Sequence, residues 1–113
     1  MQHSEDIIRL HHMLDAAEQA IAFTKNKNRA DLDTDQMLLF AVIHAIEILG
    51  EAAGKVSKEF RDQYPVLPWP SIIAMRNRLV HAYFDIDLDR VWSTVTDDIP
   101  PLISELRTLL KNV

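Results

Sequence analysis

The sequence predicts an all-α fold, an antiparallel bundle of four to five helices formed by a single domain over residues 1–113. The first reason is that the chain contains only two glycines in 113 residues, whereas folds rich in strands need many turns and usually place glycine in them. The second is that apolar residues recur at intervals of three and four along most of the chain, which is the spacing of one helix face. The connections between these segments are short, which favours antiparallel neighbours.

Composition and charge narrow the class of protein. Hydrophobic residues make up 48% and charged residues 26% of the chain, which is typical of a globular protein. The net charge of −5 argues against a broad basic surface that coats nucleic acid, so any contact with nucleic acid must be local. The absence of cysteine excludes a disulfide framework and a thiolate zinc site.

The distribution of apolar residues bears on localisation. The longest uninterrupted apolar run, residues 37–43, is much too short to span a bilayer. The N-terminal stretch MQHSEDIIRLHH has no basic region followed by an apolar one, so we see no export signal. We therefore expect a soluble cytoplasmic protein without membrane contact.

Two helices are expected in the first half of the chain. The first begins at Ser4, where Glu5 and Asp6 place negative charge at the end that the helix dipole favours. The second begins near residues 32–37, where Asp33 and Gln36 have capping-box spacing. The apolar seam of the first consists of Ile7, Leu10, Leu14, Ala17 and Ile21. That of the second consists of Leu39, Ile43, Ile46, Leu49, Ala53, Val56 and Phe60.

The second helix carries another semi-apolar face. At about 100° per residue, this face consists of Met37, Phe40, His44, Ile48 and Glu51, with Glu47 at its edge. A face exposed only to solvent is more uniformly polar. We interpret it as an interface for a second copy of the chain or for another partner.

The second half of the chain predicts an extended connector and two further helices. Three prolines within residues 65–70 indicate the connector, and a third helix begins at Pro70 and Ser71. Asp85 or Asp87 can cap the last helix. Its seam has steps of four and three and consists of Leu88, Trp92, Val95, Ile99, Leu102, Leu106, Leu109 and Val113. Because Pro100 and Pro101 lie within this seam, a kink or a break is expected there.

The third helix contains the residues best suited to chemistry, Arg76, His81 and Tyr83, in an R-x4-H-x-Y pattern. Residues five apart on an ideal helix point about 140° away from each other, whereas Asn77 and His81 share a face. Arg76 and His81 therefore converge through the long arginine side chain, through a distortion or end of the helix near His81, or across a two-fold axis between subunits.

Arginine and histidine together suit the cleavage of RNA by its own 2′-hydroxyl group. Histidine transfers protons near neutral pH, and the guanidinium of arginine fits a phosphate. The histidine would manage the proton while the arginine stabilises the pentacoordinate phosphate, and this chemistry needs no metal ion.

The string RNRLVHAY, residues 76–83, followed by the acidic DIDLDRVW and a helix with internal prolines, resembles the HEPN superfamily. More narrowly, it resembles the HepT toxins of the HepT–MntA toxin–antitoxin systems. Residues 44–57 (HAIEILGEAAGKVS) are similar to the second helix of these toxins, and residues 67–84 (LPWPSIIAMRNRLVHAYF) to the stretch that leads into their motif. The resemblance covers nearly the whole chain.

The resemblance implies a HEPN-like bundle that acts as a homodimer, with the two motif helices lining a cleft at the two-fold axis. It implies the toxin of a type VII system, a metal-independent endoribonuclease without a cofactor. By this resemblance Arg76 and His81 are catalytic, and Asn77 is the polar residue that assists them. It also implies a partner, a nucleotidyltransferase of the MNT type, that silences the toxin by attaching AMP to Tyr83. That AMP would occupy the place of an RNA phosphate beside Arg76.

Other interpretations of the site residues stay open. Arg76 and His81 could form ordinary surface salt bridges, for example with Asp85 or Glu51. Arg78 either adds positive potential to the cleft or is a solvated helix residue. Glu47 or Glu51 pairs with an arginine of the motif helix or forms part of the dimer surface. Together with His44 they would form a poor metal site. Helical metal sites have the order Glu-x-x-His, whereas here the histidine precedes the glutamate. His3, His11 and His12 are expected on the surface.

Two other functions also fit the sequence. The first is a non-catalytic helical module that pairs with a nucleotidyltransferase and helps to bind its nucleotide or substrate. The second is a simple dimerisation domain. A ribonuclease toxin should arrest growth when the chain is expressed alone, and a folded variant substituted at His81 should not. This result would distinguish the toxin from both alternatives.

Overall fold

A computed structural model describes residues 3–113 and has an all-α bundle, as the sequence predicts. Residues 1–2, which belong to the stretch considered for an export signal, lie outside the described residues. The long helical segments are α1 (Ser4–Thr24), α3 (Gln36–Lys55) and a C-terminal arm that comprises α7 (Leu88–Ser93), the π-helix η1 (Thr94–Asp98) and α8 (Ile99–Asn112). The shorter elements are α2 (Asp31–Thr34), α4 (Lys58–Gln63), α5 (Trp69–Ile73), α6 (Met75–Leu79) and the strands β1 (Val80–Ala82) and β2 (Asp85–Ile86).

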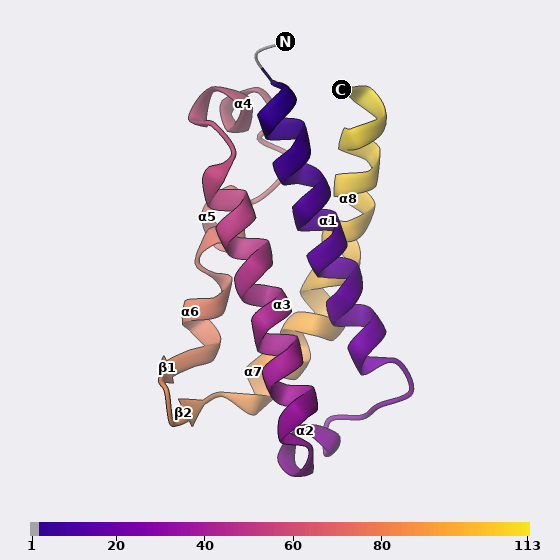
Figure 1. Ribbon diagram of the computed structural model, residues 1–113, viewed down its shortest axis with the longest axis vertical. Helices are drawn as coiled ribbons and strands as arrows, with labels where there is room; N and C mark the ends of the chain where they lie inside the picture. The colour runs from indigo at the N-terminus through magenta and orange to yellow at the C-terminus, as the bar shows by residue number, and fades with distance from the viewer. Residues whose placement is uncertain (1–2) are drawn as a thin grey trace.

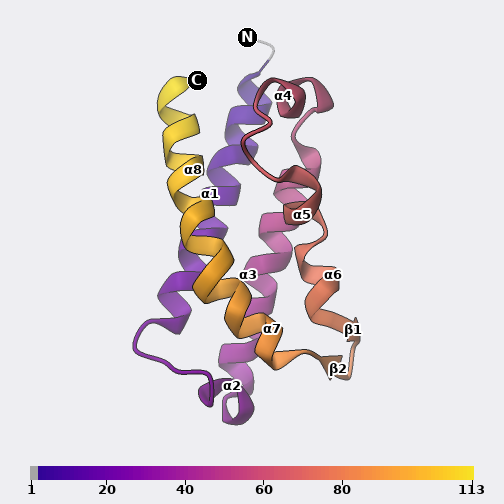
Figure 2. The ribbon, with the colours of Figure 1, turned by 180° about the vertical axis from the view of Figure 1, so that it is seen from behind.

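Neighbouring segments run antiparallel in an elongated bundle of 47 × 28 × 19 Å. The helix α1 packs against both α3 and α8, while α5 and α6 pack along the other side of α3 (Figure 1). The reverse view shows the C-terminal arm as one path from α7 to α8 (Figure 2). The start of α1, the end of α8 and α4 lie at one end of the bundle, and α2 and the β1–β2 hairpin lie at the other.

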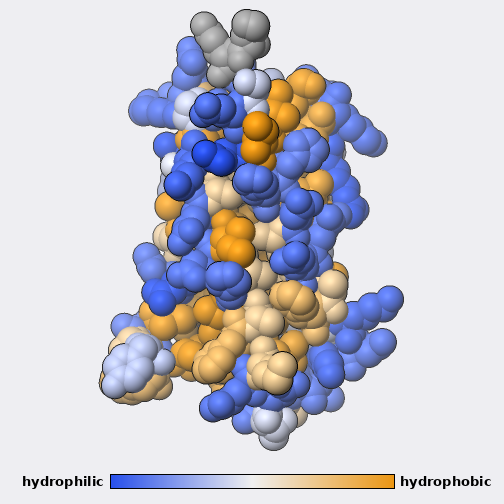
Figure 3. Space-filling model, in the orientation of Figure 1, coloured by the Kyte–Doolittle hydropathy of each residue, from blue (hydrophilic) through white to orange (hydrophobic). Residues whose placement is uncertain are grey.

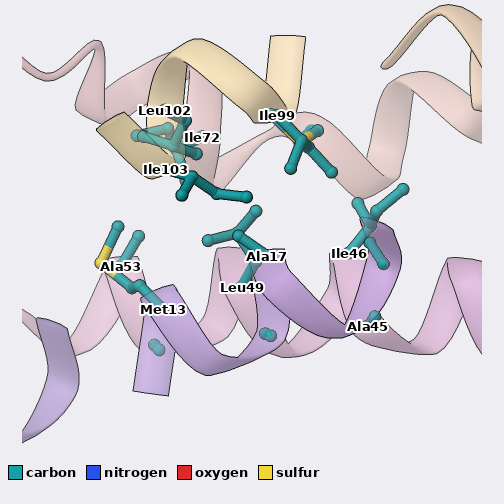
Figure 4. Close-up of a cluster of buried hydrophobic side chains, with 14 of the residues drawn as sticks. Met13, Ala17, Ala45, Ile46, Leu49, Ala53, Ile72, Ile99, Leu102 and Ile103 are labelled. Carbon is teal, nitrogen blue, oxygen red and sulfur yellow. The ribbon is translucent and has the colours of Figure 1, made fainter. Parts of the chain in front are cut away.

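The core forms where α1, α3, α5 and α8 meet, and α3 lies at its centre. Met13 and Ala17 of α1 face Ile46 and Leu49 of α3, with Ile99 of α8 above them (Figure 4). All five side chains are fully buried. Burial of one such Ile, Leu or Met side chain contributes about 1.5–3 kcal/mol. Ala17, Ile46, Leu49 and Ile99 belong to the predicted seams, whereas Met13 was not among the predicted residues.

The start of α3 corrects one prediction, because Asp35 caps this helix and Asp33 does not. Oδ1 of Asp35 accepts a hydrogen bond from the backbone N–H of Leu38 at 3.0 Å. Asp33 belongs to α2, and its Oδ2 lies 3.2 Å from Nη1 of Arg29. The capping interaction therefore begins the helix at Gln36, which is the C-terminal side of the expected region.

The seam expected from residue 39 to residue 60 is divided between two helices. The helix α3 ends at Lys55, and Val56 has an extended backbone (φ −69°, ψ 135°). Ser57 then caps α4, because its hydroxyl oxygen accepts a hydrogen bond from the N–H of Phe60 at 3.1 Å. Val56 and Phe60 are both buried, so the chain changes direction without removing either side chain from the core.

Ser57 also joins α4 to the first turn of α1. Its backbone N–H and its hydroxyl group donate to the two carboxylate oxygens of Asp6, each at 2.8 Å. Nδ1 of His3 lies 3.5 Å from the same carboxylate, and the half-buried His3 ring packs edge-on against Phe60 rather than lying on the surface as expected. Burial raises the pKa of Asp6, but the hydrogen bonds from Ser57 and the proximity of His3 outweigh this effect and leave the pKa below its ordinary value.

The expected disturbance at Pro100 and Pro101 takes the form of a π-helical turn. Neither proline has an N–H that could donate to the carbonyl four residues earlier. In η1, the N–H of Ile99 donates to the carbonyl of Thr94, five residues earlier, and α8 follows directly with both prolines in its first turn. The helical path is thus widened rather than broken. Val113, the last residue of the expected seam, is exposed beyond α8.

The helix α3 is also long and apolar enough to cross a membrane by length and composition. Its 20 residues extend well beyond the apolar run 37–43 that the sequence argument considered. About half of its most apolar window is buried in the bundle. Burial against α1 and α5 therefore accounts for this composition.

Gly50 allows α5 to approach α3 closely. A Cβ atom at Gly50 would lie 3.2 Å from the carbonyl oxygen of Ile72 and 3.3 Å from that of Ile73. These distances are shorter than ordinary van der Waals contact, and both oxygens belong to the backbone of α5. A Cβ atom at Gly54, one turn later on the same helix, would have no atom within 4 Å.

We expect alanine at these two glycines to change stability in opposite directions. Gly54→Ala should raise the free energy of unfolding by about 0.5 kcal/mol, because alanine loses less backbone entropy than glycine in a helix. Gly50→Ala should lower it by about 1–2 kcal/mol, because the added methyl group pushes α5 away from α3. Urea denaturation of both variants measures the difference. Equal effects at the two positions would contradict the proposed close approach.

Candidate functional site

The R-x4-H-x-Y segment is divided between a helix and a hairpin, which corrects the prediction of one continuous motif helix. Ala74 separates α5 from α6 with a non-helical backbone (φ −90°, ψ 0°). The helix α6 ends at Leu79, and the N–H of Asp87 donates to the Leu79 carbonyl at 2.8 Å, which closes the hairpin. Arg76 and Asn77 therefore lie on α6, whereas His81 lies on β1, and the helical i, i+4 relation between Asn77 and His81 does not hold.

Arg76 and Asn77 line an open pocket of about 410 Å³ between α3 and the α5–α6 segment. Nη1 of Arg76 lies 3.5 Å from Oδ1 of Asn77, and its Nε is buried without a hydrogen-bond partner among residues 3–113. Among the described residues, the Nη groups have no partner other than Asn77 and so retain donors for an anionic ligand. The remaining lining residues are Glu47, Gly50, Glu51, Gly54 and Ile73.

Glu47 and Glu51 share this pocket with Arg76 without forming an ion pair with it. Within the described part of the chain, no carboxylate oxygen lies within 4.0 Å of the Arg76 guanidinium. Glu47 lies instead 3.5 Å from Nδ1 of His44. Among residues 3–113 no group of three His, Cys, Asp or Glu side chains is placed to hold a metal ion.

His81 and Tyr83 lie on the hairpin, outside the lining of this pocket. Both side chains are exposed, and Tyr83 at the tip is 91% exposed. Its ring packs edge-on against Phe84, with the ring centroids 5.1 Å apart. Nδ1 of His81 lies 3.7 Å from Oδ2 of Asp85 across the hairpin. The imidazole and the phenol are thus accessible to a large substrate or to a modifying enzyme.

Arg78 lies in a different pocket from Arg76. Its Nη1 donates to the hydroxyl group of Ser71 at 2.9 Å. Asp97 and Asp98 of η1 line the same pocket, together with Pro101. Within one chain, the two arginines of the motif helix therefore face different surroundings.

An apolar surface lies beside the site at the start of α3. Met37 is 84% exposed and Phe40 is 58% exposed. Figure 3 shows apolar atoms gathered on the lower half of this face of the molecule, over the first turns of α3, while polar atoms surround them. Met37 and Phe40 of the predicted semi-apolar face are therefore uncovered in a single chain, whereas Ile48 of the same face packs against the core.

Two features of the site were not predicted from the sequence, namely Gly54 as part of the pocket wall and the β1–β2 hairpin. Gly50 and Gly54 are four residues apart and therefore lie on one face of α3. That spacing is the signal that could have indicated a face approached closely by another element. The hairpin had no comparable signal, because residues 80–86 contain neither glycine nor proline.

Comparisons of the whole sequence with known proteins identify one family. Residues 13–109 match the family model described as "Ribonuclease HepT-like". The Methanocaldococcus jannaschii protein named "Putative RNase MJ1380" is 36% identical over 97 residues, which cover 86% of this chain and 89% of that relative. The Thermococcus cleftensis protein named "Probable ribonuclease HepT" is 37% identical over 102 residues, which cover 90% of this chain and 93% of that relative. No solved structure matches the chain significantly.

Proposed function

The chain belongs to the HepT-like ribonuclease family, and from this premise we propose that it is an RNA-cleaving hydrolase that uses Arg76 and His81. The observation that carries the proposal is the state of the Arg76 guanidinium. It lines an open pocket, and no carboxylate lies within ion-pair distance of it among the described residues. His81 follows five residues later with an exposed imidazole.

The proposed reaction is an attack of the RNA 2′-hydroxyl group on the adjacent phosphorus. His81 accepts the proton of the 2′-hydroxyl as the new P–O2′ bond forms. Arg76, assisted by Asn77, stabilises the negative charge of the pentacoordinate phosphate. The P–O5′ bond then breaks and the 5′-oxygen takes up a proton, which leaves a 2′,3′-cyclic phosphate and a 5′-hydroxyl group. No step requires a metal ion.

A homodimer is part of the proposal, because Arg76 and His81 lie on different elements and because an apolar surface lies beside them. Met37 and Phe40 form an exposed apolar patch of the kind that protein interfaces cover. Pairing of two such patches would place two hairpins and two α6 helices near a common axis. Residues from both chains could then contact one RNA strand.

Tyr83 is the proposed point of control. In the proposed reaction, a partner nucleotidyltransferase directs the phenol oxygen of Tyr83 to the α-phosphorus of ATP. The bond to pyrophosphate breaks, and the phenol proton is released to solvent. The side chain is 91% exposed, which supports access for a second enzyme. The added phosphate places negative charge two residues from His81 and opposes the approach of RNA. Such silencing makes the protein the toxin of a toxin–antitoxin pair.

One observation weighs against RNA binding and leaves the alternative of a non-catalytic helical module that pairs with a nucleotidyltransferase. Glu47 and Glu51 line the same pocket as Arg76, and carboxylates repel the phosphates of RNA. The net charge of −5 acts in the same direction. The activity measurement below distinguishes this alternative from the ribonuclease.

We expect the unmodified protein to cleave RNA in the presence of EDTA. Arg76→Ala and His81→Ala should each lower the rate by at least about 100-fold, because each removes a group that acts in the transition state. His11→Ala, which changes an exposed histidine of α1, should leave the rate unchanged. The measurement is gel analysis of a labelled RNA, with melting curves to show that each variant folds.

The substrate provides a second control for this experiment. An RNA with 2′-O-methyl groups should resist cleavage, because it lacks the attacking hydroxyl group, and the products of ordinary RNA should end in a cyclic phosphate. Full activity in folded Arg76→Ala and His81→Ala would contradict the assignment. No cleavage by a parent protein of unmodified mass would favour the non-catalytic module.

We expect AMP to be attached at Tyr83 by a nucleotidyltransferase partner supplied with ATP. Tyr83→Phe should abolish the gain in mass, because phenylalanine has no oxygen to accept the group. The only other tyrosine is Tyr64, which is half-buried and packs against Phe60 with ring centroids 4.7 Å apart. Tyr64→Phe should therefore keep the modification. Intact mass spectrometry measures both variants, and labelling of Tyr83→Phe would locate the site elsewhere.

We expect the 13.0 kDa chain to have twice this mass in solution. Met37→Glu combined with Phe40→Glu should shift the protein toward the monomer, because it places charges in the apolar patch. Val66→Glu changes a residue of similar exposure on the connector (60% exposed) and should leave the dimer intact. Light scattering coupled to size-exclusion chromatography reports the mass, and a dimeric double variant would exclude this patch as the interface.

A further inference from the structure

We propose that Asp85 is a positioning residue for His81. Its carboxylate holds the imidazole with Nδ1 toward β2 and with Nε2 toward the substrate. This inference rests on the proposed role of His81 in RNA cleavage and adds a residue that acts through it. The contact that carries it is the distance of 3.7 Å between Nδ1 of His81 and Oδ2 of Asp85.

The hairpin contains a β-bulge that brings the two side chains to the same face. Val80 pairs with Ile86 and Ala82 pairs with Asp85, so the register is irregular at His81. In a regular strand, His81 and Ala82 would point to opposite faces, and Asp85 would share the face of Ala82. A bulge places two residues opposite one. His81 and Ala82 therefore both lie opposite Asp85, which brings the imidazole to the carboxylate.

The segment that carries Asp85 is fixed at its C-terminal side. The backbone N–H of Asp87 donates to the carbonyl of Leu79 at 2.8 Å. Oδ1 of Asp87 also accepts a hydrogen bond from the N–H of Arg90 at 3.0 Å and so caps α7. Val80 and Ile86, the paired residues of the hairpin, pack against the core. The backbone around the pair is thus held in place although both side chains reach solvent.

The carboxylate is placed to select the tautomer of the imidazole. Within residues 3–113, Asp85 provides the only carboxylate oxygen within 4.0 Å of a ring nitrogen of His81. A carboxylate beside Nδ1 stabilises a proton on that nitrogen, because an ionised carboxylate accepts hydrogen bonds and cannot donate them. A small rotation of either exposed side chain closes the gap to hydrogen-bond length. Nε2 then keeps its lone pair and can accept the proton of the 2′-hydroxyl.

Three charged side chains of neighbouring segments are engaged with other residues. Arg78 bonds to Ser71 on the side of η1, and Asp87 caps α7. Arg29 contacts Asp89 at 2.7 Å and Asp33 at 3.2 Å. None of these three side chains therefore competes with His81 or Asp85 for the contact between them.

The direct test is the ¹⁵N NMR spectrum of the His81 ring, recorded at a pH at which the imidazole is neutral. We expect the Nδ1–H tautomer in the parent protein, although free histidine prefers the Nε2–H tautomer. Asp85→Ala should return His81 to the Nε2–H form. Asp15→Ala removes the same charge from the exposed side of α1 and should leave the His81 signals unchanged. Melting curves of both variants show whether each is folded.

The kinetic test separates positioning from substrate binding. Asp85→Ala should lower kcat by about 10–100-fold, the range seen when outer partners of a functional histidine are removed, and should leave KM nearly unchanged. Asp85→Asn keeps a hydrogen-bond acceptor without the charge and should restore part of the loss in kcat.

The two readouts distinguish a failure of this inference from a failure of the proposed function. An active parent whose His81 is the Nε2–H tautomer, or a folded Asp85→Ala with unchanged kcat, would overturn the role of Asp85 alone. A parent of unmodified mass that cleaves no RNA would overturn the catalytic role of His81, and that of Asp85 with it, whatever the tautomer.

Discussion

The placement of the motif segment depends on the contact between two backbones at Gly50. The carbonyl groups of Ile72 and Ile73 lie where a side chain at position 50 would otherwise be. This contact sets the distance between α3 and α5, and α6 follows α5 after one residue. Because Gly50 has no side chain, α5 and α6 lie close to α3, and this distance determines the depth of the Arg76 pocket. Gly50 itself takes no part in the proposed chemistry. A bundle that was equally stable but more widely spaced would separate Arg76 from the α3 wall of its pocket.

The long helices could be predicted from the sequence because their apolar spacing is uninterrupted and because burial enforces it. Leu10, Ala17, Ile46, Leu49 and Leu106 all lie in predicted seams, and all are fully buried. The helix ends were harder to predict. Asp31, Asp33 and Asp35 are all plausible caps. In the structure Asp31 accepts a hydrogen bond from the N–H of Asn28 and Asp33 pairs with Arg29, whereas Asp35 caps α3. Spacing along the chain does not reveal which of the three carboxylates is engaged elsewhere.

The candidate site was predicted as a set of residues but not as an arrangement. The pattern of Arg76, His81 and Tyr83 and the proximity of Glu47 and Glu51 to the motif helix followed from chemistry and from the resemblance. An end of the helix near His81 was one alternative that the sequence left open. The hairpin after Leu79 was not predicted, because it depends on the pairing of Val80 with Ile86 and on the Asp87–Leu79 hydrogen bond. These contacts also place His81 opposite Asp85 on the hairpin.

The separation of the two ends of the bundle has a practical consequence for experiments. The end of α8 lies at the same end of the bundle as α4, whereas the hairpin lies at the opposite end of a molecule 47 Å long (Figure 1). A fluorescent protein or an affinity tag attached behind α8 would therefore be far from Tyr83 and His81. Such a fusion leaves the hairpin clear for a large partner, so the same labelled protein can serve in imaging, in pull-down and in turnover measurements.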